Sequence, residues 1–435
     1  MSLPNAGSIA PQAPTLPLEI VEEIATHASG KDTFKAASTV SRAWLSAFRP
    51  KLFAHIVLGK RFVAATASPI FADDKRLLPF ITSVKVQGIL TALVNEKLLV
   101  ALNMLPKLES LELSGVGFGW DQTTPQSTEL LVQLLQKESL QMLSVEFAAD
   151  HYSGFPLALI PFCRRVRTLN LEDTRLLLPL FSETHSLFSS LTRNLENLEC
   201  SEPSPVALRT LKLSGTGLIS RFAHFHSQYQ GWLSPNSLER LELDYADSRT
   251  GTPSRAVGEL LRAFGTSVKM LSITVYRPED LRGGPPLNTV DLEKLHQVHT
   301  LELTLSSEAD DDFAIFVHTW ACHVLETLSA KDSITKIAIT CQIINYPTAI
   351  LDYFTPSLDP VYSALDLVLG SQAGFESLKE CTIVFKPCGR VAVRMISTEV
   401  QANQGHTDEE PLEDKFPCIQ ERKINFYAAF IPGNL

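Results

Sequence analysis

Seven cysteines are the residues of this 435-residue chain best suited to metal binding or nucleophilic catalysis. They lie far apart in the sequence, as Cys163, Cys200, Cys322, Cys341, Cys381, Cys388 and Cys418. Because they form no C-x-x-C pair and are odd in number, they indicate reduced thiols in an intracellular protein. The chain also lacks a G-x-S-x-G elbow, an H-E-x-x-H pair and a Walker loop. We therefore expect no enzyme, no catalytic residue, no metal and no cofactor.

Two pairs of histidines could also carry chemistry. His224 and His226 alternate in RFAHFHSQY, and His318 and His323 flank Cys322. Neither pair has carboxylate or cysteine partners at metal-ligand spacing. We expect all four to be structural.

Two further segments invite a chemical interpretation. The stretch LSGVGFG (113–119) resembles a nucleotide loop, but LSGTGL recurs at 213–218, and a phosphate loop must open directly into a helix. Both are expected to be turns between repeats. The acidic residues 408–414 are expected to form a solvated loop, with a metal or basic-partner site as the alternative.

Charge and hydropathy exclude two classes of partner. The net charge of −10 and the pI of about 5.6 argue against nucleic acid, because phosphate binding needs a concentrated positive field. The most apolar run, ILTALVNEKLLVALNML, is interrupted by Asn95, Glu96 and Lys97, so no membrane span is expected. These observations predict an intracellular protein, cytoplasmic or nuclear.

Three short helices are expected near the N-terminus. Pro17 can begin the first helix, Asp32 can cap the second, Ser41 can cap the third, and Pro50 is expected to end it. Helices of this length bury too little apolar surface to fold alone. The missing stabilisation must come from the rest of the chain or from another protein.

The residues of this region resemble the F-box, whose pattern is L-P-x-E-[IL]-[LV]-x-x-I, an acidic residue, V-[SC]-[KR]-x-W and L-[WF]-x-x-I. The matching positions are Leu16, Pro17, Glu19, Ile20, Val21, Ile24, Asp32, Val40, Ser41, Arg42, Trp44, Leu52, Phe53 and Ile56. The match covers residues 15–58. Phe53 and Ala28 depart from it, since many members have Trp and a larger aliphatic residue there.

The resemblance implies docking to the Skp-type adaptor of a ubiquitin ligase and, through it, to a cullin scaffold. The implied adaptor-binding residues are Leu16, Pro17, Leu18, Ile20, Val21, Ile24, Val40, Trp44, Leu45 and Phe53. The alternative is a helical cap that covers the same apolar residues against the following domain.

The rest of the chain repeats one pattern: apolar, two variable, apolar, one variable, apolar. It occurs ten times, as Ile81-Val84-Val86, Leu108-Leu111-Leu113, Leu140-Leu143-Val145, Val166-Leu169-Leu171, Leu208-Leu211-Leu213, Leu238-Leu241-Leu243, Val268-Leu271-Ile273, Val298-Leu301-Leu303, Ile334-Ile337-Ile339 and Leu378-Cys381-Ile383. The occurrences at Leu208, Leu238, Val268 and Val298 follow one another at a constant 30 residues. Such a period predicts a repeat fold.

Helical stretches between these strands, such as 127–137 and 254–265, complete each unit. The units resemble leucine-rich repeats, which implies a mixed α/β solenoid with parallel strands on the concave side and helices outside. Where that family has Asn or Cys, this chain has Val116, Thr174, Thr216 and Ala246. We therefore expect an irregular solenoid.

These interpretations predict four regions: a disordered lead (1–14), the F-box (15–58), the solenoid (59–389) and a C-terminal cap with an acidic loop (390–435). The predicted function is substrate recognition in a cullin-based ubiquitin ligase, with an unknown protein as substrate. The alternative is a leucine-rich scaffold outside the ubiquitin system.

The predicted substrate surface is the row of side chains between the last two apolar positions of each strand, because these alternate to the concave face. The candidates are Lys85, Glu112, Ser144, Asn170, Lys212, Glu242, Ser272, Glu302, Ala338 and Thr382. Loops near 172–207 and 340–377 are further candidates.

Overall fold

The computed structural model describes most of the chain between Leu16 and Phe430. The described residues are 16–59, 76–88, 95–116, 123–147, 157–173, 194, 205–228, 231–234, 236–246, 252–277, 290, 292–308, 318–329, 331–344, 362–370, 374–388, 417–421 and 425–430. The predicted lead (1–14), the acidic residues 408–414 and most of the candidate loop near 172–207 lie outside them. So do residues 345–361 and 371–373 of the candidate loop near 340–377.

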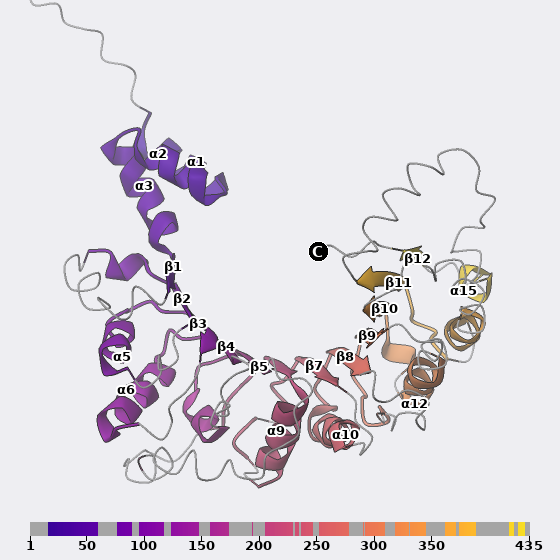
Figure 1. Cartoon of the computed structure of the whole chain (residues 1–435). Coiled ribbons are helices and arrows are strands. Elements are labelled where there is room, and N and C mark those ends of the chain that lie inside the picture. The colour runs from indigo at the N-terminus through magenta and orange to yellow at the C-terminus, as the bar shows by residue number, and fades with distance from the viewer. Residues whose placement is uncertain are drawn as a thin grey trace, which may run out of the picture.

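A parallel sheet of twelve strands forms the centre of the molecule, with the strands side by side in chain order (Figure 1). They are β1 (His55–Leu58), β2 (Ser83–Gln87), β3 (Ser110–Val116), β4 (Met142–Phe147), β5 (Thr168–Asp173), β6 (Thr210–Ser214), β7 (Arg240–Ala246), β8 (Met270–Arg277), β9 (Thr300–Glu308), β10 (Lys336–Ile344), β11 (Glu380–Cys388) and β12 (Asn425–Phe430). The ten predicted strands are confirmed as β2 to β11. β12 lies within the predicted C-terminal cap (390–435).

The sheet bends into an open arc, and the helices that follow its strands lie on the outer side (Figure 1). They include α5 (Glu96–Asn103), α6 (Pro125–Leu135), α9 (Thr216–Gln228), α10 (Thr252–Phe264), α12 (His323–Thr327) and α15 (Pro417–Glu421). A mixed α/β fold with a parallel concave sheet was expected. The open sheet is compatible with the predicted solenoid.

The core lies between the sheet and these helices. Equivalent apolar residues of successive strands lie at the same register, so Leu111 is opposite Leu143, Leu143 is opposite Leu169, and Leu211 is opposite Leu241. Each of them is at most 1% exposed. The L-x-x-L-x-L pattern therefore stacks its leucines into continuous columns, which no single repeat could bury alone.

A backbone carbonyl at the start of each repeat holds the next repeat in place. The carbonyl oxygen of Arg209 accepts hydrogen bonds from the N–H of Glu239 at 2.8 Å and of Arg240 at 2.9 Å. The same double acceptance recurs in each repeat from the carbonyl of Ala54 to that of Thr335. We call this series the carbonyl ladder.

Thr216 replaces the Asn or Cys of the leucine-rich repeat pattern and joins two repeats. Its Oγ1 donates to the carbonyl oxygen of Ala246 and accepts from the Ala246 N–H, both at 3.0 Å. Among the described strands, the register shifts at Ser114/Val116 and elsewhere runs without a break. The variation in repeat length therefore lies in the segments between the strands, and the strands themselves stay in register. Thr174 lies outside the described residues.

Three helices precede the sheet, as expected: α1 (Leu18–His27), α2 (Lys31–Ser38) and α3 (Arg42–Phe53). Two details of the prediction were wrong. Gly30, with φ of 90°, is the N-cap of α2, so Asp32 lies within its first turn. Pro50 lies inside α3, which continues to Phe53 because a proline removes only one helical hydrogen bond. Ser41 caps α3 as predicted, accepting from the N–H of Trp44 at 3.4 Å.

Strand β1 begins within the range predicted for the F-box. Ile56 lies opposite Val84, and Leu58 lies opposite Val86. Leu58 is 2% exposed and belongs to the main core. The hydrophobic ending of the F-box-like region therefore supplies the first layer of the sheet.

The C-terminal layer is clasped by a carboxylate of the helix at 362–370. Asp366, 5% exposed, accepts from the N–H of Cys418 at 3.0 Å and of Ile419 at 2.9 Å. A Cβ added at Gly370 would lie 2.4 Å from the Cβ of Cys418, so this approach requires glycine. The clasp fixes α15 just before β12.

The stacked leucines predict a large local loss of stability on truncation. Leu271 is fully buried in β8, and Leu271→Ala should lower the free energy of unfolding by about 2–5 kcal/mol, because it leaves a cavity. The neighbouring concave substitution Ser272→Ala should change it by less than about 0.5 kcal/mol. Urea unfolding followed by circular dichroism measures both. Equal effects would contradict the packing described here.

Candidate functional site

The three N-terminal helices have a small core of their own. Ala25, Ala37 and Phe48 are buried, and the rings of Phe34 and Trp44 lie 5.9 and 5.7 Å from the ring of Phe48. This cluster is separate from the core beneath the sheet. The α1–α3 module therefore gains little stability from burial.

A lysine joins the first and third helices of this module. Lys51 Nζ of α3 donates to the carbonyl oxygens of Thr26 at 2.9 Å and Ala28 at 3.4 Å, at the end of α1. The same ammonium lies 5.5 Å from the centre of the Phe34 ring. A cation at the C-terminal end of a helix satisfies carbonyl groups that have no helical partner.

Several large apolar side chains of this module face solvent. Ile20 and Ile24, one turn apart on α1, are 48% and 37% exposed, and Leu16, one turn earlier, is 50% exposed. Leu18 at the start of α1 is 44% exposed, and Val40 between α2 and α3 is 64% exposed. We call these five residues the docking face; Leu16, Ile20 and Ile24 follow one side of α1, and Leu18 lies on another side. Each keeps more than a third of its surface open to solvent, and such a concentration on a small module is typical of an interaction site.

The other predicted adaptor-binding residues are placed differently. Val21 is 1% exposed because it lies on the inward side of α1, one turn before Ala25. Trp44, Leu45 and Phe53 are half-buried, and Pro17 is exposed. Sequence alone could not separate these two sides of α1, because both are apolar.

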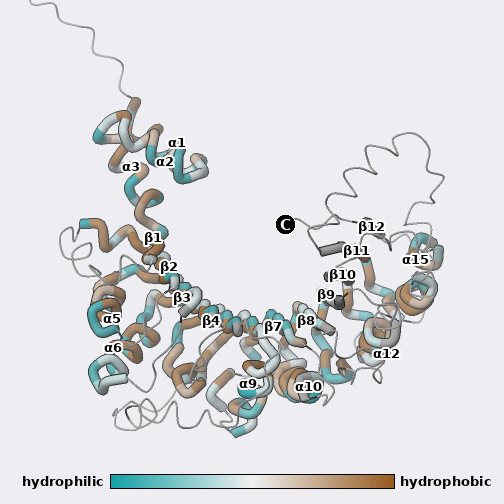
Figure 2. Tube along the Cα trace, in the orientation of Figure 1, coloured by the Kyte–Doolittle hydropathy of each residue, from teal (hydrophilic) through white to brown (hydrophobic). Residues whose placement is uncertain are grey.

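The predicted concave residues form one unbroken row across the sheet. Strand pairing places each beside the next, in the order Lys85, Glu112, Ser144, Asn170, Lys212, Glu242, Ser272, Glu302, Ala338 and Thr382. All are half-buried. Val57 and Tyr427, which the repeat pattern missed, extend the row at its two ends. Figure 2 shows polar and apolar residues mixed along the strands that line the inner side of the arc.

The charges of this row are largely paired. Lys85 Nζ lies 3.0 Å from Glu112 Oε2, and Glu242 pairs with Arg240 two residues earlier in β7. Two residues before the row on β10 and β11, Lys336 pairs with Glu380. The row therefore presents alternating charge and hydroxyl groups and has no continuous basic stripe, which suits a protein surface better than nucleic acid.

A second concave row, two residues further along each strand, contains unpredicted carboxylates. Glu146 and Glu172 lie opposite one another, and Asp244 accepts a hydrogen bond from Ser214 at 3.1 Å. Burial raises the pKa of the Asp244 carboxyl above its ordinary value of 3.8, against the lowering effects of Ser214 and Lys212. Glu172 raises it further. The sequence could have indicated this row, because its residues recur with the same repeat period, two positions after the predicted concave row.

Most of the described cysteines are buried thiols. Burial raises the pKa of Cys163, Cys341 and Cys381 to about 12, so these thiols stay protonated at neutral pH. His323 is exposed, and the side chain of His318 lies outside those described. Within the described residues, no group of three or more His, Cys, Asp or Glu side chains could hold a metal ion.

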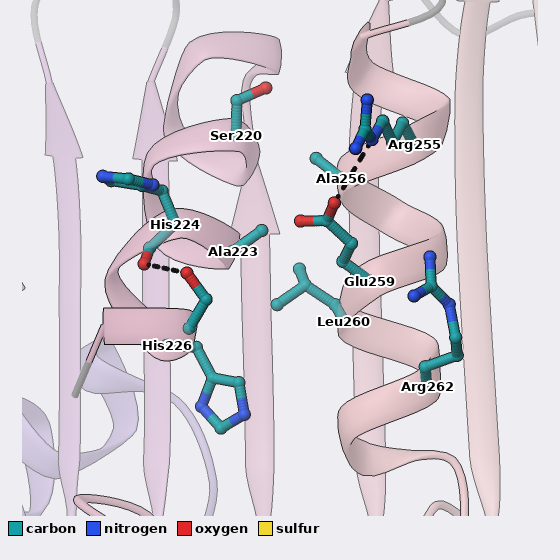
Figure 3. Close-up of a pocket in the computed structure, with 10 residues that line it drawn as sticks. Ser220, Ala223, His224, His226, Arg255, Ala256, Glu259, Leu260 and Arg262 are labelled. Carbon is teal, nitrogen blue, oxygen red and sulfur yellow. Dashed lines mark hydrogen bonds and ion pairs between the residues drawn. The ribbon is translucent and has the colours of Figure 1, made fainter. Parts of the chain in front are cut away.

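His224 and His226 line a groove of about 540 Å³ between α9 and α10 (Figure 3). Their rings point apart, and the His226 ring packs 4.7 Å from that of Phe264. Burial lowers the pKa of His226 below 6.5, which keeps it neutral. Arg255 Nε and Glu259 Oε1 lie 3.4 Å apart in the same groove and neutralise one another. His226 thus packs against the core, whereas His224 is exposed and lies 2.9 Å from the amide of Gln228. That both histidines are structural stays a prediction.

Comparison with known proteins leaves the chain unassigned, because neither a family model nor a curated protein matches it. Across the part of the chain that the structure describes, none of the helices combines the length and the apolar character of a membrane span. The docking face and the concave rows are therefore interpreted from their own chemistry.

The raised pKa of Asp244 predicts a pH-dependent effect on stability. Because its folded-state pKa lies above the unfolded value, its contribution to stability is full at low pH and is lost as pH rises through the folded pKa. Asp244→Asn, which can keep the Ser214 hydrogen bond, should therefore be more stable than the parent chain at pH 7. The difference should vanish as pH falls below 3.8. Urea unfolding at several pH values measures it, and a constant difference would show that ionisation of Asp244 is unimportant.

Proposed function

We propose that this protein is the substrate-recognition subunit of a cullin-based ubiquitin ligase. The α1–α3 module docks to a Skp-type adaptor, and the concave side of the sheet holds a protein substrate. The chain itself carries out no bond chemistry. It raises the concentration of the bound substrate near the ubiquitin-charged enzyme on the scaffold.

The observation that carries this proposal is the exposed docking face on a module with its own small core. Leu16, Leu18, Ile20 and Ile24 occupy positions of the F-box-like pattern or lie beside them, and each keeps more than a third of its surface exposed. Exposed aliphatic side chains gain roughly 25 cal/mol for each Å² that a partner removes from water. A partner surface supplies the stabilisation that the module lacks.

The alternative of an intramolecular cap fits this arrangement less well. The module stands beyond β1 at one end of the arc (Figure 1). Its main contacts with the rest of the described chain run from α3 to β1 and to the 3-10 helix at Leu78–Phe80. A cap would bury its exposed apolar side chains against the first repeat, whereas Ile20 and Ile24 of α1 and Val40 after α2 stay in solvent.

The concave rows support a protein as the recognised molecule. They combine paired charges, hydroxyl groups and the carboxylates Glu146, Glu172 and Asp244. Polar surfaces of mixed charge are typical of transient protein interfaces, where a few side chains decide specificity. A repeat scaffold outside the ubiquitin system would use the same surface and is distinguished by the docking face alone.

Adaptor binding tests the proposal directly. Leu18→Ala, Ile20→Ala and Ile24→Ala combined should weaken binding of the full chain to a purified Skp-type adaptor by about 100-fold or more, since each truncation removes about 1 kcal/mol or more of contact. The control is Val100→Ala, Met104→Ala and Leu367→Ala combined, because these exposed apolar residues lie on outer helices of the repeats. Calorimetry should show unchanged affinity for the control. No binding by the intact, folded parent chain would refute the ligase proposal.

Removal of the module separates docking from capping. A chain that begins at Ala54 keeps β1, and we expect it to retain the circular dichroism of the sheet and a cooperative urea transition while losing adaptor binding. A cap should behave differently, because its loss exposes the first repeat. Aggregation or strong binding of an apolar dye by the truncated chain would favour the cap.

A further inference from the structure

The groove between α9 and α10 has no part in the proposed function. These helices follow the adjacent strands β6 and β7, and the groove between them has a volume of about 540 Å³ (Figure 3). Its floor is apolar: Ala223 of α9 is 4% exposed, and Ala256 and Leu260 of α10 are 6% and 0% exposed. Figure 3 shows the methyl groups of Ala223 and Ala256 directed toward the opposite helix. Two such small side chains leave open the space that larger ones would fill.

The rim of this groove carries more positive than negative charge. Arg255 and Arg262 line it on α10, and Glu259 is the one carboxylate among the described residues that line it. Glu259 pairs with Arg255, one turn away on the same helix. Arg262, one turn beyond Glu259, is exposed and forms no ion pair with any described residue. Its guanidinium group is therefore available to a carboxylate, which it can bind with two parallel hydrogen bonds.

A hydroxyl group on the α9 side of the groove lacks a partner. Ser220 Oγ is buried, and no described residue forms a hydrogen bond with it. Figure 3 shows this hydroxyl on the side of α9 that faces α10. The large majority of buried polar side-chain atoms in proteins are hydrogen-bonded. A peptide backbone carries both donors and acceptors and can supply the missing partner.

We propose that this groove binds an acidic segment of a partner protein. A carboxylate of the segment pairs with Arg262, and a small apolar side chain beside it lies on the floor formed by Ala223, Ala256 and Leu260. The volume of the groove falls within the range of about 300 to 1,000 Å³ that is usual for binding pockets. The groove lies on the outer side of the arc, away from the docking face and the concave rows (Figure 1). The inference is therefore independent of adaptor binding.

Fluorescence anisotropy with the full chain tests the proposal, and the probe is a labelled peptide of alternating glutamate and alanine, about ten residues long. The parent chain should bind this peptide with a Kd of about 100 μM or below. Arg262→Glu should weaken binding by about tenfold or more, because it places like charges opposite one another. Lys97→Glu is the matched control, since Lys97 is an exposed cation on the outer helix α5 and the change in net charge is the same. It should leave the affinity unchanged.

Two variants that fill the floor separate the groove from its charge. Ala256→Leu and Ala223→Leu, made singly, keep Arg262 and should each weaken peptide binding by about tenfold or more, because a leucine occupies the space that the peptide needs. Circular dichroism identifies the variants that are folded.

Four results would overturn the proposal. The parent chain may not bind the peptide, a folded floor variant may bind it as tightly as the parent, or Lys97→Glu may lose as much affinity as Arg262→Glu. The fourth is self-association of the parent chain in analytical ultracentrifugation that Arg262→Glu abolishes, which would assign the groove to a second copy of this chain.

Discussion

The double acceptance by each carbonyl of the carbonyl ladder is the interaction on which the rest of the structure depends. Each such carbonyl fixes the start of the next strand, as Arg209 does for Arg240. Once the starts are aligned, every later residue of a strand has a fixed neighbour. The columns of leucines, the concave rows and the outward placement of the helices all follow from this one alignment.

The alignment also explains why the two parts of the chain differ so much in the apolar surface that they bury. Repeats share columns of buried residues with their neighbours on both sides, whereas the α1–α3 module packs Phe48 among only a few partners. A module of this kind is well suited to binding, because its exposed apolar side chains are not buried in its own core and are available to a partner. Among the described residues, its main contacts with the rest of the chain run through α3, to β1 and to the 3-10 helix at Leu78–Phe80, which leaves α1 accessible.

Much of the fold was predictable because its cause is periodic. Leucines such as Leu211 and Leu241 recur at fixed spacing, and a spacing can be read without coordinates. The F-box-like pattern likewise located α1 to α3. Periodicity could not show that Val21 faces inward while Ile20 faces solvent, because both belong to an apolar helix in which tertiary contacts alone decide the orientation.

Other features of the candidate surface depend on contacts between residues that are far apart in the sequence, which a local sequence pattern does not reveal. Asp244 is distinguished by its burial beside Ser214 and Glu172, and these residues lie 30 or more positions away. β1 was not predicted as a strand, because Ile56 had been assigned to the F-box-like pattern. Tyr427 became informative only when strand pairing placed it at the end of the row.

The Asp366 clasp gives the C-terminal layer a mechanical character. Its carboxylate holds two backbone N–H groups that lie 52 and 53 residues later in the sequence. A pull on the C-terminus can open the β11–β12 ladder one bond at a time, but it loads both bonds of the clasp together. The clasp therefore keeps α15 in place after β12 has been pulled away, and it must break before α15 can leave.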